Sequence, residues 1–252
     1  MTNSWIVKPK PNPSAQLKLV CLPFEGGGSN SFRNWVQFLP KQIELLAIEI
    51  PGRGQRLREP LRTRMHELVP DITSSLSKEL DRPYALFGHS MGTLLGIELS
   101  HHLRAEYQQE ATHLFFSGRG APHLPSKEKP IHHLPEDEFI TQIRHYNGTP
   151  KEVLDHEELM ELMVPILRAD FEVCETYSYN NHPKLSCPLS IYGGLQDVAA
   201  PREAMQAWAE LTEGPFNLRM FPGDHFFILS NTQTLLSSIL KDLNEHFTLT
   251  SN

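Results

Sequence analysis

A serine between two glycines is the first feature of this sequence that suggests chemistry. Residues 88–92 read Gly-His-Ser-Met-Gly, which places Ser90 in a G-x-S-x-G pattern. The apolar run Tyr84–Phe87 precedes the pattern and the helical pattern Met91–Leu103 follows it. A tight strand-to-helix turn of this kind exposes the serine hydroxyl, and the helix N-terminus favours negative charge above it. Ser90 is therefore the candidate nucleophile; the alternative is a serine in an ordinary glycine turn.

A serine hydroxyl needs a base, and the chain has 13 histidines. His225 follows the apolar run Asn217–Phe221 and precedes the helical pattern Thr232–Phe247. Sites in parallel α/β sheets assemble at such strand ends. The other histidines show no clean metal-ligand spacing. We therefore predict that His225 is the general base.

An acidic residue is expected between the serine and the histidine in the chain. Asp197 follows the apolar run Pro188–Tyr192 and precedes a helix that begins with proline. Asp224 adjoins His225 directly, so the two side chains would face each other poorly, and Asp170 lies in a less fixed helical segment. We predict that Asp197 orients the histidine and stabilises its charged form. The alternative role for Asp197 is a cap at the start of a helix.

A glycine-rich turn follows the first predicted strand, where residues 22–29 read Leu-Pro-Phe-Glu-Gly-Gly-Gly-Ser. It lacks the G-x-G-x-x-G spacing of a dinucleotide loop and the Lys-Ser/Thr pair of a P-loop. Where a serine elbow is present, a loop after an early strand supplies the second N–H of the oxyanion hole. We predict the backbone N–H groups of Met91 and Phe24 as the two donors, with Glu25 as the alternative to Phe24.

Apolar runs alternate with helical patterns along the chain, which predicts an α/β fold: a mainly parallel central sheet flanked by helices. We expect a single domain over residues 1–252. The predicted strands are Leu17–Leu22, Ile43–Ile50, Tyr84–Phe87, His113–Ser117, Pro188–Tyr192 and Asn217–Phe221. The predicted helices are Met91–Leu103, Pro201–Leu211 and Thr232–Phe247.

The segment from about 134 to 180 interrupts this alternation, because it has helical patterns and no strand. Its apolar stripe is rich in methionine and phenylalanine and contains Pro165. Such an insertion is typical of a lid over a pocket for a flexible acyl chain. Ordinary packing of helices against the sheet is the alternative.

Composition excludes several classes of protein. The net charge of -7 disfavours nucleic-acid binding, which needs a basic surface. No segment reaches the roughly 20 consecutive apolar residues of a membrane helix, and the N-terminus does not resemble a secretory signal. The 3 cysteines, at wide spacings, favour neither a disulfide framework nor zinc. We expect a cytoplasmic protein, a monomer by default, with no metal.

The ordered motifs resemble those of type II thioesterases, the α/β-hydrolases that accompany polyketide and nonribosomal peptide synthetases. The N-terminal half carries Leu22-Pro23-Phe24-x-Gly26-Gly27, Phe32, Trp35, Pro51-Gly52-Arg53 and the serine motif. The C-terminal half carries Leu167-Arg168-Ala169-Asp170-Phe171, Glu175-Thr176-Tyr177, Cys187-Pro188, Gly194, Asp197, Trp208 and Gly223-Asp224-His225-Phe226-Phe227. The resemblance covers nearly the whole chain. Glu25 departs from the small residue expected there and would change the mouth of the pocket.

The resemblance implies a substrate: an acyl group held as a thioester on the phosphopantetheine arm of an acyl or peptidyl carrier protein. Ser90 would attack the carbonyl with His225 as base, and the thiol would leave. Water activated by His225 would then release the acid. The family clears misloaded or stalled acyl groups from carriers, and no metal or organic cofactor is needed.

A basic cluster in the acidic chain is formed by Arg53, Arg56, Arg58, Arg62 and Arg64. Carrier proteins are typically acidic, so we expect a local basic surface to bind the carrier or the phosphate of its arm. The candidates are Arg53 and Arg56 of this cluster and Arg33 near the glycine-rich turn. The alternative is a solvated loop with ion pairs to Glu59 and Glu67.

The sequence leaves other functions open. A general carboxylesterase or acyl-CoA thioesterase would use the same three residues, and only dependence on a carrier separates it from the first reading. A noncatalytic module that binds acyl carriers is a third possibility, which the intact set of Ser90, Asp197 and His225 disfavours. A chain-terminating domain cut from a synthetase fits less well, because the sequence has its own Met1 and no fused carrier segment. The pathway, the acyl chain and the carrier are not specified.

Overall fold

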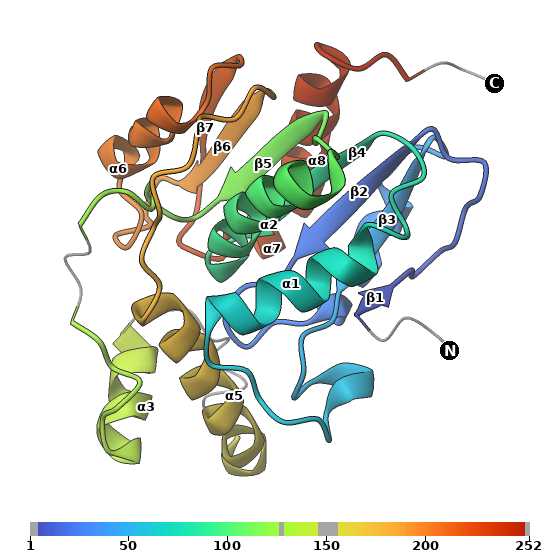
Figure 1. Ribbon diagram of the computed structural model, residues 1–252. Coiled ribbons are helices and arrows are strands. Elements are labelled where there is room, and N and C mark those ends of the chain that lie inside the picture. The colour runs from blue at the N-terminus through green and yellow to red at the C-terminus, as the bar shows by residue number, and fades with distance from the viewer. Residues whose placement is uncertain (1–4, 126–128, 146–155, 250–252) are drawn as a thin grey trace.

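The computed structural model describes residues 5–125, 129–145 and 156–249. A 7-stranded sheet in the order β1-β3-β2-β4-β5-β6-β7 forms its centre (Figure 1). The strands are β1 (Ile6–Val7), β2 (Leu17–Leu22), β3 (Ile43–Ile48), β4 (Tyr84–His89), β5 (His113–Ser117), β6 (Leu189–Gly194) and β7 (Phe216–Phe221). Each strand predicted from the sequence is present. The short edge strand β1, which pairs antiparallel with β3, was not predicted because two residues carry no period. The other pairs are parallel.

Strand β2 is buried on both faces, and its alternate side chains enter two separate cores. Val20 and Leu22 pack with helices α1 (Met65–Leu76) and α2 (Met91–Tyr107). Leu19 and Cys21 pack with the 3-10 segment η1 (Ser29–Gln37) and helix α8 (Thr232–Asn244). Figure 1 shows α1 and α2 in front of the sheet and α8 behind it. Burial on both faces explains why the strands read as continuous apolar runs.

Two helical expectations need correction. Helix α1 was missed, and it contains Pro70 beyond its first turn, where proline removes one backbone N–H donor from the helix. The predicted helix Pro201–Leu211 is two pieces, helix α6 (Arg202–Gln206) and the 3-10 segment η3 (Ala207–Leu211). Pro201 caps α6 from outside rather than occupying its first turn, since its ψ is 149°. Helix α7 (Phe227–Ser230) is a short turn before α8.

The insertion between β5 and β6 contains helix α3 (Glu136–His145) and helix α5 (Glu157–Glu175), and a lid role for residues 134–180 stays a prediction. Residues 146–155 of that range lie outside the described residues. The two helices share a small core of their own, which includes Phe139, Ile143 and Val164. Figure 1 shows both helices on the side toward which the parallel strands point, the edge at which sites form.

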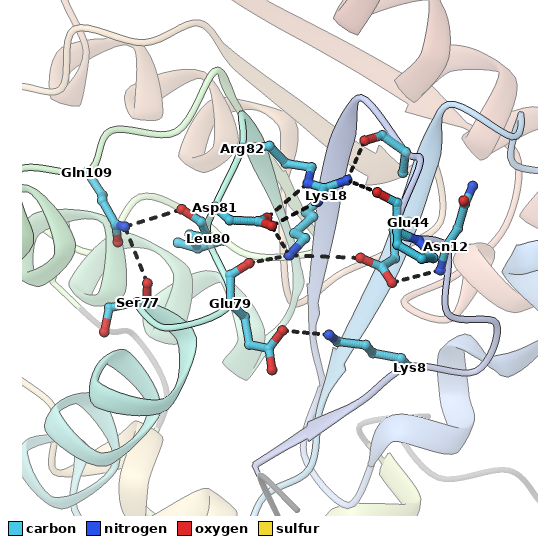
Figure 2. Close-up of polar contacts among 12 residues, drawn as sticks. Lys8, Asn12, Lys18, Glu44, Ser77, Glu79, Leu80, Asp81, Arg82 and Gln109 are labelled. Carbon is cyan, nitrogen blue, oxygen red and sulfur yellow. Dashed lines mark hydrogen bonds and ion pairs between the residues drawn. The ribbon is translucent and has the colours of Figure 1, made fainter.

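A buried lysine lies at the other end of the sheet, where strand β2 begins (Figure 2). Lys18 of β2 is 3 % exposed, and its ammonium binds the carbonyl of Glu79 and, at 2.8 Å, the carboxylate of Asp81. Glu44 lies 3.9 Å from the same ammonium. Hydrogen bonds from Arg82 and Lys18 hold the pKa of Asp81 well below its usual range. A buried charge requires such partners, so we assign this cluster to structure.

Candidate active site

Ser90 lies between β4 and α2 in a backbone conformation that side chains rarely adopt. Its φ is 53° and its ψ is -115°, and its N–H donates to the carbonyl of Ser117 at 2.8 Å. The neighbouring glycines are required by close packing. A Cβ at Gly88 would lie 2.1 Å from the carbonyl oxygen of Gly92, and a Cβ at Gly92 would lie 2.4 Å from that of Leu22. The G-x-S-x-G pattern therefore forms a strained turn of the nucleophile-elbow type.

His225 and Asp197 are joined by a hydrogen bond, which lies between Nδ1 and Oδ2 at 2.8 Å. The other carboxylate oxygen of Asp197 accepts the N–H groups of Ala199 at 3.0 Å and Ala200 at 3.3 Å. The Asp197 side chain is 1 % exposed and that of His225 is 13 % exposed. The carboxylate is thus fixed both to the imidazole and to the backbone of the loop before α6. The cap of α6 is Pro201, so Asp197 does not take the alternative role of a helix cap.

The competing aspartates have other partners. Asp224 accepts the N–H of Phe226 at 2.9 Å and so closes the turn before α7. Asp170 is 1 % exposed and binds Arg53 through both carboxylate oxygens. Of the three candidates, Asp197 is the one that these contacts place on His225.

His89 is a residue of the site that sequence reasoning passed over, because it is the variable position of the motif. Its side chain is fully buried, and Nδ1 lies 3.0 Å from the hydroxyl of Ser117. Its ring centre lies 4.9 Å from that of His225. Burial, together with the nearby His225, lowers the pKa of His89 well below its usual value, so its ring stays neutral. A neutral ring against the imidazole of His225 fixes its position without adding charge.

The glycine-rich turn after β2 reaches the serine. The carbonyl of Phe24 accepts the N–H of Gly27 at 2.9 Å, and Gly26 has a φ of 74°, which favours glycine. The side chain of Glu25 points into the site: its Oε2 accepts the N–H of Met91 at 3.2 Å. Its Oε1 lies 3.5 Å from Arg119. Of the two predicted donors, Met91 is therefore beside the turn; whether Phe24 or Glu25 supplies the second N–H stays a prediction.

Several charges act on the Glu25 carboxylate. Burial raises its pKa, while the charge of Arg119, the N–H of Glu25 itself, the charge of His225 and a hydrogen bond from Ser90 lower it. The lowering effects prevail, so the pKa of Glu25 is below its usual value and the carboxylate is ionised at neutral pH. Ser90 and His225 thus both lie close enough to act on one carboxylate.

Two of the arginines proposed for docking face inward. Arg53 is 7 % exposed and binds Asp170 at 2.7 Å and the carbonyl of Gly27 at 2.9 Å. Burial lowers its pKa, but the charge and hydrogen bond of Asp170, together with the charge of Glu49, raise the pKa above its usual value. A guanidinium so buried and paired offers no surface to a partner. The docking role expected of Arg53 is therefore not supported, and its role is to hold the glycine-rich turn.

Arg56 is also buried and paired. It is 5 % exposed, its Nε binds Glu59 at 2.9 Å, and its guanidinium lies 3.7 Å from the ring centre of Trp5. The alternative reading, an ion pair within the loop, is the one that the contacts of Arg56 support. Arg33, in contrast, is exposed on η1 and stays a docking prediction.

Comparison with known proteins shows which family the chain belongs to. The family model described as "Thioesterase domain" matches residues 17–243. The chain belongs to the thioesterase family. It is 38% identical over 241 residues to the gramicidin S biosynthesis protein GrsT of Aneurinibacillus migulanus, covering 96% of this chain and 94% of the relative. It is 39% identical over 245 residues to the linear gramicidin dehydrogenase LgrE of Brevibacillus parabrevis, covering 96% and 93%.

A solved structure is similar over nearly the whole chain. The type II thioesterase BorB from the borrelidin biosynthetic cluster has a TM-score of 0.88 and 33% identity, covering 95% of this chain and 98% of that chain. The thioesterase thus has the α/β-hydrolase fold and hydrolyses thioesters. None of the helices in its described residues has the length and hydropathy that crossing a membrane requires. Within the same residues, no group of three or more His, Cys, Asp or Glu side chains forms a metal site.

Proposed function

We propose that this thioesterase hydrolyses acyl groups held on the phosphopantetheine arm of acyl or peptidyl carrier proteins, and so clears misloaded or stalled groups in polyketide or nonribosomal peptide biosynthesis. The Asp197–His225 hydrogen bond of 2.8 Å beside the strained Ser90 turn is the observation that carries it. The names of GrsT and BorB associate those relatives with gramicidin S biosynthesis and with the borrelidin biosynthetic cluster.

In this mechanism the Ser90 hydroxyl attacks the thioester carbonyl and His225 takes its proton. Asp197 holds the imidazole in place and stabilises its positive charge. The negative oxygen of the tetrahedral intermediate binds backbone N–H groups, Met91 being one. The C–S bond then breaks, and the thiolate takes the proton from His225.

Deacylation repeats these steps with water. His225 takes a proton from the water as it attacks the Ser90 ester, and returns the proton to the serine oxygen as the acid leaves. A thiol has a pKa near 8.5 and leaves readily, so the first step needs less acid assistance than amide cleavage. The three side chains and the backbone supply every group that the reaction uses, and no cofactor takes part.

Carrier recognition needs an exposed positive side chain, and Arg33 is the candidate for it. The chain carries a net charge of -7, which repels an acidic carrier at long range. Arg33 is exposed on η1, directly after the glycine-rich turn. With Arg53 and Arg56 turned inward, Arg33 is the predicted docking residue that retains an exposed side chain.

The name of LgrE raises a second activity, that of a dehydrogenase. The glycine-rich turn of this chain reads Gly26-Gly27-Gly28 and has Ser31 where a third spaced glycine of a dinucleotide loop would fall. The Cβ of any residue at position 26 would also lie 2.7 Å from Leu167 of α5, so the lid fills the space above the turn. We therefore do not propose dehydrogenase activity.

The testing experiment is single-turnover release of acetate from an acetylated phosphopantetheinyl carrier protein, with the acetyl thioester of free pantetheine in parallel. Wild type and Ser90→Ala are compared. Fast turnover that needs Ser90 and prefers the carrier is the expected result. Equal modest rates on both substrates would indicate a general esterase or acyl-CoA thioesterase. Tight carrier binding without turnover would indicate a binding module.

A further inference from the structure

The carboxylate of Glu25 lies against a backbone N–H that the reaction needs for the oxyanion. It accepts the N–H of Met91 at 3.2 Å, and the hydroxyl of Ser90 and the N–H of Glu25 itself also act on it. Met91 is the donor that follows the nucleophile, so its N–H belongs to the oxyanion hole. We propose that the Glu25 side chain fills the oxyanion hole of the free enzyme, and that a substrate must displace it before Ser90 attacks.

A carboxylate suits this place for a physical reason. The oxyanion hole directs backbone donors at a developing negative oxygen, and a carboxylate oxygen carries negative charge permanently. The N–H of Glu25 itself acts on that carboxylate together with the N–H of Met91. This inference takes the site from the proposed function but does not depend on which thioester is the substrate.

Two contacts besides the N–H of Met91 hold the carboxylate in the hole. Arg119, in the loop after β5, lies 3.5 Å from Oε1, and the Sγ of Cys174 on α5 donates to the same oxygen at 3.3 Å. The Glu25 side chain is 14 % exposed. Burial would favour the neutral acid, but its pKa is lowered overall, so the group stays charged while it is held. Displacement therefore moves a carboxylate rather than a neutral acid.

Displacement requires the side chain to rotate, because the backbone of the turn is fixed. The N–H of Gly26 donates to Asp170 of α5 at 2.8 Å, and Gly27 donates to Phe24. Arg119 is 32 % exposed, so its side chain has room to follow. A carboxylate that leaves Met91 keeps the ion pair with Arg119 as it turns toward the solvent.

An internal occupant reduces the apparent affinity for every substrate by the same factor, the fraction of molecules with an empty hole. Removal of the carboxylate therefore raises kcat/KM equally for a carrier-bound acyl group and for a small thioester. A docking residue behaves differently, because it affects the carrier alone. Glu25 thus sets the general reactivity of the serine, and the lid contact at Cys174 links that reactivity to α5.

The experiment measures the second-order rate at which an alkyl fluorophosphonate labels Ser90. The serine oxygen bonds to phosphorus, fluoride leaves, the serine proton passes to His225, and the phosphoryl oxygen takes the oxyanion hole. We expect Glu25→Ala to label about 10-fold faster than wild type. Glu25→Asp shortens the side chain by one methylene and keeps its charge, so it is also expected to label faster than wild type. The labelling rate of Glu25→Gln should lie between those of wild type and Glu25→Ala. Glu203→Ala, at an exposed position of α6, is the matched control and should label like wild type.

Equal or slower labelling of both Glu25→Ala and Glu25→Asp would overturn the inference. If alanine alone labels faster and aspartate matches wild type, the charge of Glu25 rather than its place in the hole is responsible, which also overturns it. Should alanine prevent folding, aspartate and glutamine decide. Acyl-carrier turnover is measured on the same proteins: faster labelling without turnover of any thioester would overturn the proposed function and leave this inference standing.

Discussion

Arg53 and Asp170 form a buried ion pair that joins three parts of the molecule. Their two hydrogen bonds measure 2.7 and 2.8 Å, with Asp170 on α5 and Arg53 in the loop after β3. Both residues also bind the glycine-rich turn: Arg53 donates to Gly27 at 2.9 Å and Asp170 accepts from Gly26 at 2.8 Å. The pair thus fixes helix α5 and the glycine-rich turn to the same point.

Breaking this pair should destabilise the protein strongly. Arg53→Met leaves Asp170 buried without its partner, and we expect the free energy of unfolding to fall by about 3–5 kcal/mol in urea denaturation. The control is Arg62→Met, because the Arg62–Asp71 pair is 3.4 Å long and 41 % and 47 % exposed. That change should cost less than about 1 kcal/mol. Equal small losses in both variants would contradict the anchoring role.

Asp197→Asn should reduce kcat for thioester hydrolysis by about 10³–10⁴-fold, because the amide neither enforces the imidazole tautomer nor stabilises its positive charge. KM should change little, since Asp197 reaches the reaction only through His225. Steady-state kinetics on a small acyl thioester check this. Asp224→Asn is the matched control, and its kcat should stay within about threefold of wild type. A large loss at Asp224 with a small one at Asp197 would reverse the assignment.

Arg33→Glu should raise KM for an acylated carrier protein by about 10-fold and leave hydrolysis of the small thioester unchanged. The effect should shrink as salt is added, because exposed charges are screened. Lys241→Glu reverses a charge at an exposed position of α8 and is the control for net charge. If both reversals weaken carrier turnover equally, long-range repulsion rather than docking at Arg33 explains the result.

The buried His113 predicts a loss of stability in acid. It is 2 % exposed, its Nε2 lies 3.0 Å from the Ser190 hydroxyl, and burial lowers its pKa to about 4. The unfolded chain has a histidine pKa near 6.5, so between pH 6.5 and 4 it binds a proton that the native state does not. The free energy of unfolding should therefore decrease as the pH is lowered from 6.5 to 4, by up to about 1.4 kcal/mol per pH unit from this residue.

The variant His113→Gln tests this effect. Its unfolding free energy is measured against wild type at pH 8, 6 and 5, and the gap between the two should move in favour of the variant as pH falls. Other groups titrate in both proteins and cancel in the difference. A gap that stays constant from pH 8 to 5 would show that His113 does not contribute.

The sequence by itself determined the parts of this protein that depend on neighbouring residues. The elbow at Ser90 could be predicted because a strand, a glycine-flanked serine and a helix follow one another within a short stretch. The buried strands could be predicted because both faces are covered and their runs are apolar throughout. Chain order placed His225 and Asp197 at strand ends, and the insertion could be predicted because it has a helical pattern without a strand.

The tertiary structure decided what the charged side chains do. Arg53 read as a surface residue because charged groups are usually exposed, and nothing nearby in the sequence indicated Asp170, which is 117 residues away. Glu25 read as a change at the mouth of the pocket, yet its carboxylate lies on Met91, 66 residues further along the chain. A partner so distant leaves no period or spacing in the sequence. Whether a charge is solvated or buried therefore depends on which elements the fold brings together.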